Sequence, residues 1–351
     1  MLDFTAAKLE QVALHYVGNK SNGEEMYLSK TLMDIEADKT KELLFKFFLP
    51  PFAATEFYNF TFSNGDFNLN PLFHFAEKIF ANPNDLQPTS IDIAKHLYEV
   101  STHPNIKPGD VFVAYFSNLG IDDQPMDAIG IFKSENKQSF LKVAGEEGDF
   151  SILFEDGINI DKLDKGCLIL NTDKENGFKV CVIDKSNKQE AQYWKELFLQ
   201  IKPCSDGYHF TKDMMAITKN FVTGHLAEEF SITKTDQIDL LNRSVEYFKT
   251  HEQFEKSEFE QEVFHHANII ESFQGFDEKY REQHNIEMDD QFEISNQAVK
   301  KQARIFKNVL KLDKNFHVYI HGNRDLIQQG VESDGRKFYK IYFENVEMQD
   351  R

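Results

Sequence analysis

The chain of 351 residues is long enough for two domains, and with 41% hydrophobic and 13% aromatic residues it can form packed cores. A formal net charge of −19 excludes a protein that coats a polyanion with its whole surface, and no apolar run reaches the roughly 20 residues that span a bilayer. The first residues do not resemble a secretory signal, and Cys167, Cys181 and Cys204 show no C-x-x-C spacing. We therefore expect a cytoplasmic protein with reduced thiols and no membrane partner.

The first 202 residues alternate between strand-like segments and amphipathic helices. The periodicity and turn residues predict strands over 10–17, 24–29, 111–116, 126–133, 140–143, 167–171 and 178–183. They predict helices over 38–48, 70–80, 90–101 and 192–201, with Ser90 as the N-cap of the third. Pro50-Pro51 ends the first helix. This order indicates an α+β domain over residues 1–202, built on a mainly antiparallel sheet.

From residue 208 onward the pattern is mainly helical. Helices are predicted over 211–229, 235–251, 257–280 and 295–312. Strands follow over 316–320, 326–332 and 337–343, with Asp334-Gly335 as a hairpin turn. The second domain, residues 208–351, is therefore expected to be helical and to end in a three-stranded antiparallel β-meander over 316–343, packed under the helix at 295–312.

The segment that opens this tail is the one long basic run of an acidic chain. No acidic residue lies between Glu293 and Asp313, and on a helix four cations of the run fall within a stripe about 60° wide. They are Lys300, Arg304, Lys307 and Lys311, with Lys301 at the edge of the stripe. Residues 295–340 contain ten Lys/Arg and four Asp/Glu, a net charge of +6, which leaves −25 for the rest of the −19 chain. A solvated helix face would also carry lysines, so the charge segregation is what favours a polyanion site.

Motifs for catalysis or metal binding are nearly absent. There is no H-E-x-x-H, P-loop or G-x-G-x-x-G motif, so we expect no cofactor and no metal site. Three histidine patterns have spacing or surroundings that do not favour a metal: His225 with Glu228 and Glu229, His265 with His266, and His317 with His321. Asp127, Glu135 and Lys137 follow the D…E-x-K order of metal-dependent nucleases. Because Glu135 and Lys137 fall in a polar turn, a surface loop explains them better.

Several short strings, in order, resemble the bacterial nucleoid-associated protein family of the NdpA type. These strings are Val12-Ala13-Leu14-His15, Gly109-Asp110-Val111-Phe112-Val113 with Phe116-Ser117-Asn118-Leu119, Gly166-Cys167-Leu168-Ile169-Leu170-Asn171, Tyr193-Trp194 before Phe198, Lys311-Leu312-Asp313 before Phe316, and Phe338-Tyr339-Lys340-Ile341. The resemblance spans nearly the whole chain. It implies a cytoplasmic protein found with the nucleoid, and no catalytic residues come with it.

We therefore expect a non-enzymatic nucleoid-associated protein that contacts DNA weakly and without sequence preference. The expected phosphate contacts are Lys300, Lys301, Arg304, Lys307, Lys311, Arg336, Lys337 and Lys340. Five such contacts predict a salt slope of about −4.5. One alternative is an interaction module that docks on another nucleoid protein; another is the nuclease of Asp127, Glu135 and Lys137. The helices between 211 and 280 can supply a homodimer interface or can be internal.

Overall fold

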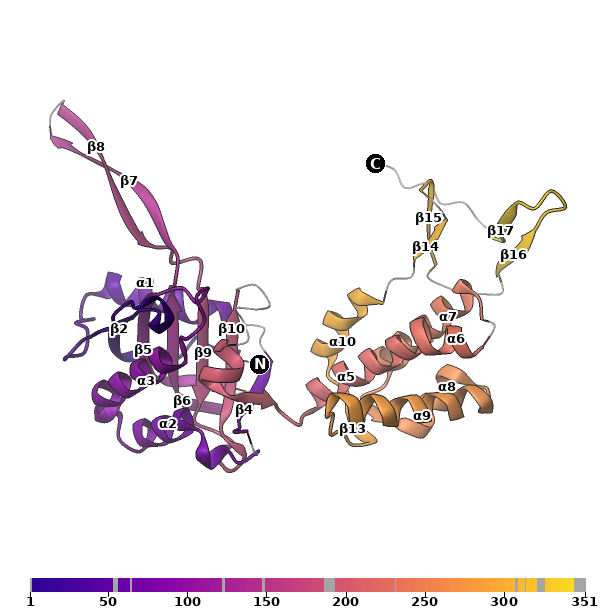
Figure 1. The fold of residues 1–351 in the computed structure, drawn as a ribbon, viewed down its shortest axis with the longest axis horizontal. Coiled ribbons are helices and arrows are strands. Elements are labelled where there is room, and N and C mark those ends of the chain that lie inside the picture. The colour runs from indigo at the N-terminus through magenta and orange to yellow at the C-terminus, as the bar shows by residue number, and fades with distance from the viewer. Residues whose placement is uncertain are drawn as a thin grey trace. The chain divides into compact units, whose positions relative to one another are not determined.

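The computed structural model describes residues 2–52, 56–63, 65–121, 124–146, 149–185, 193–230, 232–306, 309–312, 314–320 and 326–343. The chain divides into two compact units, Met1–Cys204 and Ser205–Arg351, which we call the N-terminal and C-terminal units (Figure 1). The fold is α+β, with an antiparallel sheet in the first unit and helices followed by antiparallel strand pairs in the second.

A nine-stranded antiparallel sheet forms the centre of the N-terminal unit. Its order is β11-β4-β10-β9-β6-β5-β2-β3, and β1 pairs with the end of β5. The strands are β1 (Leu2–Asp3), β2 (Lys8–Val17), β3 (Tyr27–Leu28), β4 (Phe57–Phe60), β5 (Gly109–Ile121), β6 (Gln124–Ser134), β9 (Lys165–Leu170), β10 (Lys179–Asp184) and β11 (Ile201–Pro203). The predicted pairing of the strands at 111–116 and 126–133 is confirmed, because β5 and β6 are antiparallel neighbours.

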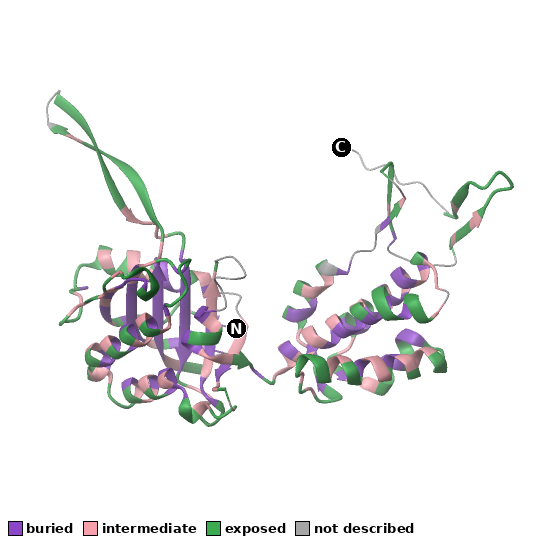
Figure 2. Cartoon of the chain, viewed as in Figure 1, coloured by how far each residue is buried: buried purple, intermediate pink, exposed green. Residues whose placement is uncertain are grey.

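Both faces of this sheet are covered, which explains why its central strands are apolar throughout (Figure 2). Along β5, Val111 and Val113 belong to one core, and Phe112 and Phe116 belong to the other. Helices α2 (Pro71–Ala81) and α3 (Leu86–Val100) pack in the first core, and α1 (Asp38–Phe48) packs in the second. A π-helical segment, η6 (Tyr193–Leu199), closes the first core with the buried Trp194.

The helix ends follow local chemistry in most places. Asn70 caps α2 by accepting hydrogen bonds from the backbone N–H groups of Leu72 and Phe73, and Pro71 occupies the first turn. The prediction that Ser90 is an N-cap is wrong, because α3 starts at Leu86. Pro88 fits inside its first turn, where no intrahelical N–H bond is lost.

A long hairpin, β7 (Lys137–Glu146) with β8 (Asp149–Ile158), forms a two-stranded sheet of its own (Figure 1). The strand predicted over 140–143 is the middle of β7, whereas β8 was not predicted. The two strands pair in register from Lys137 opposite Ile158 to Glu146 opposite Asp149. Most of the hairpin is exposed (Figure 2).

The C-terminal unit begins as a helical layer around one phenylalanine-rich core. Its helices are α5 (Gly207–Asn220), the π-helical η7 (Phe221–His225), α6 (Leu226–Glu229), α7 (Lys234–Thr250), α8 (Lys256–Phe264), α9 (Ala267–His284) and α10 (Asn296–Gln302). Strands β12 (Gln253–Glu255) and β13 (Gln291–Glu293) pair beside them. Helix α7 starts with a capping box in which Thr233 and Asp236 satisfy each other's backbone N–H groups.

Two predicted helices differ from the observed ones. The helix expected over 257–280 is divided into α8 and α9 at His265, whose φ of +59° lies outside the helical region. The helix expected over 295–312 ends as α10 at Gln302, followed by one 3-10 turn, η8 (Ala303–Ile305). Residues Val309–Leu312 form strand β14, because a short V-L-x-L run also suits a strand and pairs here with the next segment.

The tail consists of two antiparallel hairpins. Strand β14 pairs with β15 (Phe316–Tyr319), and β16 (Ile327–Val331) pairs with β17 (Lys337–Ile341). The strands are antiparallel, as predicted, but they form two pairs where a three-stranded meander was expected. Gly335, with a φ of +85°, makes the predicted turn between β16 and β17. A small cluster that includes Leu310, Ile320 and Ile327 packs with Ile238 of α7.

The three cysteines are all buried in the N-terminal unit. Cys167 of β9 and Cys181 of β10 lie on adjacent strands but belong to the cores on opposite faces of the sheet. Burial raises the pKa of the Cys167 thiol well above its ordinary value. None of the described helices is long and apolar enough to cross a membrane.

Candidate nucleic-acid interface

The first cations of the predicted DNA-binding set lie on α10 and the turn after it. Ser295 caps α10 by accepting a hydrogen bond from the Ala298 N–H, and Ala298 and Val299 are buried where α10 meets α5 and α7. This packing leaves Lys300 and Lys301 exposed on α10 and Arg304 exposed on η8. The Lys301 ammonium lies 3.2 Å from the Tyr208 hydroxyl and 5.9 Å from the centre of its ring. Helix packing therefore presents these three cations to solvent.

Lys311 belongs to a different element from the one predicted. It lies exposed on β14, directly opposite His317 of β15, while the adjacent Leu310 faces the core cluster. The expected single helical stripe of Lys300, Arg304, Lys307 and Lys311 is therefore wrong, and Lys307 lies outside the described residues. The cations at 300, 304 and 311 are instead spread over a helix, a turn and a strand.

The second hairpin carries the remaining predicted cations. Arg336, Lys337 and Lys340 are all exposed on or beside β17. The Arg336 guanidinium Nε lies 2.7 Å from Asp334 Oδ2, and the Lys340 ammonium lies 4.9 Å from the centre of the Tyr342 ring. Both hairpins rise from the same side of the helical layer (Figure 1).

Aromatic side chains alternate with cations along this segment, a feature that our sequence analysis missed. At every second position from 336 to 342 the residues are Arg336, Phe338, Lys340 and Tyr342; Phe338 and Lys340 share one face of β17, and Arg336 and Tyr342 flank the strand at the same spacing. Phe338 and Tyr342 are both exposed. The two-residue period was the signal available in the sequence. Such a face can contact phosphates through its cations and stack its rings on unpaired bases.

Few acidic groups lie among these cations. Within the described part of residues 296–343 the acidic residues are Glu332 and Asp334, and Asp334 forms an ion pair with Arg336. No ion pair joins Lys300, Arg304 or Lys311 to another described residue, so their charges face solvent. The arrangement suits phosphate contact better than an intramolecular salt-bridge network.

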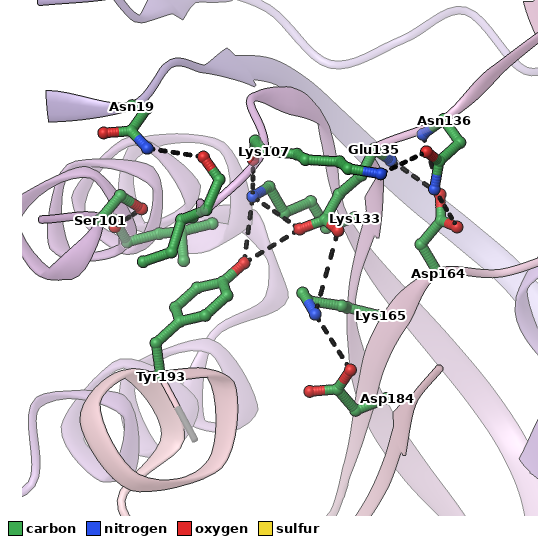
Figure 3. A network of polar contacts seen from close by, with 12 residues as sticks. Asn19, Ser101, Lys107, Lys133, Glu135, Asn136, Asp164, Lys165, Asp184 and Tyr193 are labelled. Carbon is green, nitrogen blue, oxygen red and sulfur yellow. Dashed lines mark hydrogen bonds and ion pairs between the residues drawn. The ribbon is translucent and has the colours of Figure 1, made fainter. Parts of the chain in front are cut away.

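The N-terminal unit contains a contrasting, buried polar network (Figure 3). The Lys133 ammonium donates to Glu135 Oε1 at 3.0 Å, to the Tyr193 hydroxyl at 3.1 Å and to the Lys107 carbonyl at 2.6 Å. The Tyr193 hydroxyl donates in turn to Glu135 Oε1 at 3.0 Å. Lys165 lies 3.0 Å from Asp184 and 3.9 Å from Glu135. Both lysine side chains are 1% exposed, and burial lowers the pKa of Lys133.

This network changes the interpretation of the turn at Glu135. We expected a surface loop, but the Glu135 carboxylate is buried. Asp164 fixes the turn by accepting hydrogen bonds from the backbone N–H groups of Glu135 and Asn136. Each cation and anion has a fixed partner, so the network stabilises the junction of β6, β9, β10 and η6.

The structure does not assemble the nuclease constellation. Asp127 lies near the start of β6 and Glu135 directly follows its last residue, Ser134, so their separation of eight residues corresponds to about 26 Å of extended strand. Asp127 accepts a hydrogen bond from the Tyr115 hydroxyl, and Lys137 pairs with Asp110. Two carboxylates at that separation cannot share one metal ion, so the structure does not support a site built from these three residues, and nuclease activity stays a matter for experiment.

The histidine patterns considered in the sequence are also placed. His225 Nε2 lies 3.2 Å from Glu229 Oε2, His265 sits at the break after α8, and His321 lies outside the described residues. A cluster that we did not consider brings His251, Glu258 and Glu262 together, with one ligand-type atom from each within 4.8 Å. Its signal was the one-turn spacing of the two glutamates. Both glutamates are exposed, so water can satisfy them, and the cluster alone does not establish a metal site.

Comparison with known proteins gives one result that covers nearly the whole chain. The family model described as nucleoid-associated protein YejK matches residues 13–337. This range includes most of the N-terminal sheet, the helical layer, the β14–β15 hairpin and strand β16, and it ends at the first residue of β17. No curated protein matches the chain.

Proposed function

The chain belongs to the nucleoid-associated protein YejK family, and on this premise we propose that it associates with DNA directly, through its C-terminal cations. The described contact residues would be Lys300, Lys301, Arg304, Lys311, Arg336, Lys337 and Lys340. The contacts would be to phosphates, and the protein would act on DNA by binding and not by catalysis.

The segregation of charge carries this proposal. Residues 295–340 have a net charge of +6, whereas the remainder of the chain has −25. The Debye length at physiological salt is about 8 Å, so a local patch attracts phosphate while more distant acidic groups are screened. The exposure of all seven described cations supports the same conclusion, because solvated side chains can exchange water and counterions for phosphate oxygens.

The arrangement favours weak binding without sequence preference. Helix α10 has seven residues, a length of only about 10 Å, and its cations come from its last turn. The others come from a 3-10 turn and two hairpins, so no single element presents a row of side chains to base edges. Four to seven phosphate contacts predict a log–log salt slope between about −3.5 and −6.

The test is fluorescence anisotropy of a labelled duplex, titrated with the purified chain at several salt concentrations. A variant with Lys300→Gln, Arg304→Gln, Lys311→Gln and Lys340→Gln should reduce the steepness of the slope by about 3 to 4. A matched control removes four exposed cations of the N-terminal unit, Lys30→Gln, Lys39→Gln, Lys41→Gln and Lys95→Gln, and should bind as the wild type does. The proposal fails if the wild type does not bind at low salt, or if both variants lose affinity equally.

The non-enzymatic part of the proposal has its own experiment. Supercoiled plasmid is incubated with the protein and Mg²⁺ or Mn²⁺ under conditions in which anisotropy shows binding. We expect the plasmid to stay supercoiled. Nicking of the plasmid by the wild-type protein would overturn this part of the proposal.

A further inference from the structure

The β7–β8 hairpin, which we call the arm, has no hydrophobic core of its own. Its strands pair over ten positions, a length of about 33 Å, and form a sheet that no other described strand joins. Figure 1 shows it projecting from the N-terminal unit, and Figure 2 marks most of its residues as exposed. A two-stranded sheet in water is at best marginally stable alone, so an arm of this length implies a partner surface.

The two faces of the arm differ in chemistry. One face, which we call the apolar face, carries five large side chains, with exposures of 73%, 68%, 74%, 71% and 74% for Leu141, Val143, Phe150, Ile152 and Phe154. The register places Leu141 beside Phe154 and Val143 beside Ile152 on this face. The opposite face has the Lys142–Glu155 ion pair at 3.2 Å and two side chains, Phe140 and Leu153, that are about half exposed. This is the pattern of an antiparallel sheet with one face packed and one face in water.

The charges of the arm exclude a polyanion or an anionic lipid surface as the occupant. From Ser139 to Asp156 the apolar face carries no lysine or arginine. Residues 137–158 contain two lysines and five Asp/Glu, a net charge of −3, so the arm repels phosphate groups. The occupant is therefore expected to be an apolar, uncharged protein surface.

The apolar face is large enough to form a small dimer interface. Five side chains that each expose on the order of 120 Å² give about 600 Å², and two copies would bury about 1,200 Å², the lower end of stable, specific interfaces. Monomers rarely leave a contiguous apolar patch of that size in water. A second copy of the chain supplies an apolar face of the same size by definition.

We propose that two copies associate through their apolar faces, with the arms antiparallel about a two-fold axis at the Val143–Ile152 pair. About this axis, positions 141 and 145 exchange, as do 150 and 154. Leu141 of one copy then lies over Gly145 of the other, and Phe154 lies over Phe150. Gly145 leaves a gap that no other residue can fill, because its φ is +147° and an added Cβ would lie 2.0 Å from the Asp149 carbonyl oxygen. This dimer does not depend on the proposed DNA contacts.

The position of Ile152 allows a sharp test, because the axis sets Ile152 of one copy against Ile152 of the other. In sedimentation equilibrium of the full chain, the wild type should be a concentration-dependent dimer. Ile152→Glu places like charges at the axis and should raise the dimer Kd at least 100-fold, and Ile152→Lys should do the same. An equimolar mixture of the two variants should dimerise again, since opposite charges then meet.

Leu153→Glu is the matched control, because residue 153 is the next along β8 and points to the opposite face. It should dimerise as the wild type does. The proposal is overturned if the wild type stays monomeric up to about 100 µM, if Ile152→Glu and Leu153→Glu have the same effect, or if the mixed variants do not associate. Rescue in the mixture also shows that each single variant has a folded arm.

Discussion

The lysines of the polar network in the N-terminal unit are buried and paired, whereas those of the candidate interface in the C-terminal unit are exposed to solvent. Lys133 and Lys165 lie between β6, β9 and η6 with fixed partners and almost no exposure, while Lys300, Lys311 and Lys340 lie on the C-terminal unit with their charges in water. Buried cations have lost their hydration and depend on their partners, so they hold the sheet together and are not accessible to a ligand. Exposed cations contribute little to folding but can bind phosphate. Composition alone therefore says little about function until each cation is placed.

Removing a buried cation should have the largest effect on the free energy of unfolding. Lys165→Met leaves the buried Asp184 carboxylate without its ammonium partner, and we expect the free energy of unfolding of the N-terminal unit to fall by about 3–5 kcal/mol. Urea unfolding followed by the fluorescence of Trp194, the single tryptophan, reports on this unit. Lys41→Met, at an exposed cation of the same unit, should change stability by less than about 0.5 kcal/mol. A loss below about 1 kcal/mol for Lys165→Met would show that the network is not a structural element.

Removing a single hydroxyl from the network should have a smaller effect. Tyr193→Phe deletes the group that accepts from Lys133 and donates to Glu135, and hydrogen bonds to charged groups contribute about 1.5–3 kcal/mol. Tyr27→Phe, at an exposed tyrosine of β3 in the same unit, is the matched control and should be neutral. The same Trp194 unfolding curves measure both variants. Equal effects would mean that burial does not distinguish the two hydroxyls.

The exposed cations can be divided into two groups to locate the DNA contacts. Lys300→Gln with Arg304→Gln alters the end of α10, and Arg336→Gln with Lys340→Gln alters β17. If both groups touch phosphate, each pair should reduce the steepness of the salt slope by about 1.8 and weaken duplex binding roughly tenfold. Salt titration of anisotropy measures this, with Lys39→Gln and Lys41→Gln as the control pair. A full effect from one pair and none from the other would confine the interface to that element.

A buried histidine should make the stability of the N-terminal unit depend on pH. His15 is buried and accepts a hydrogen bond from the Ser29 N–H at Nδ1, and burial lowers its pKa from 6.5. As pH falls through 6.5 the unfolded chain takes up a proton that the folded chain resists, so stability falls with pH. His15→Gln should make this slope shallower by up to about 1.4 kcal/mol per pH unit. Urea unfolding of the wild type and of His15→Gln between pH 7 and 5.5 tests this, and equal slopes for the two proteins would contradict it.

Local signals in the sequence predicted the elements that depend on local chemistry. Helix α1 was predicted over its observed range because Pro50 ends it, and β5 and β6 follow from dense apolar runs between turns. The basic segment after Gln302 was mistaken for a helix, because lysines at helical spacing coincide there with a run that also suits a strand. Short apolar runs are ambiguous until the partner strand is known.

The features that were missed depend on residues far apart in the chain. The burial of Glu135 requires Lys133, Lys165 and Tyr193, which come from three elements, so a polar turn looked like surface. The amphipathic pattern of the arm becomes visible only when β7 and β8 are paired, because its apolar face is divided between the two strands. The cations at 300, 304, 311 and 340 were recognised as a set, but their distribution over separate elements was not.

Because of where the cysteines lie, thiol alkylation can report local unfolding of the N-terminal unit without an added label. All three thiols are buried in the N-terminal unit and none lies in the C-terminal unit. A thiol-alkylating reagent at neutral pH should therefore react only when the sheet opens, and at Cys167 the raised pKa further suppresses the reactive thiolate. The alkylation rate of the wild-type protein thus measures the opening of the N-terminal unit, and the C-terminal unit does not contribute because it contains no cysteine.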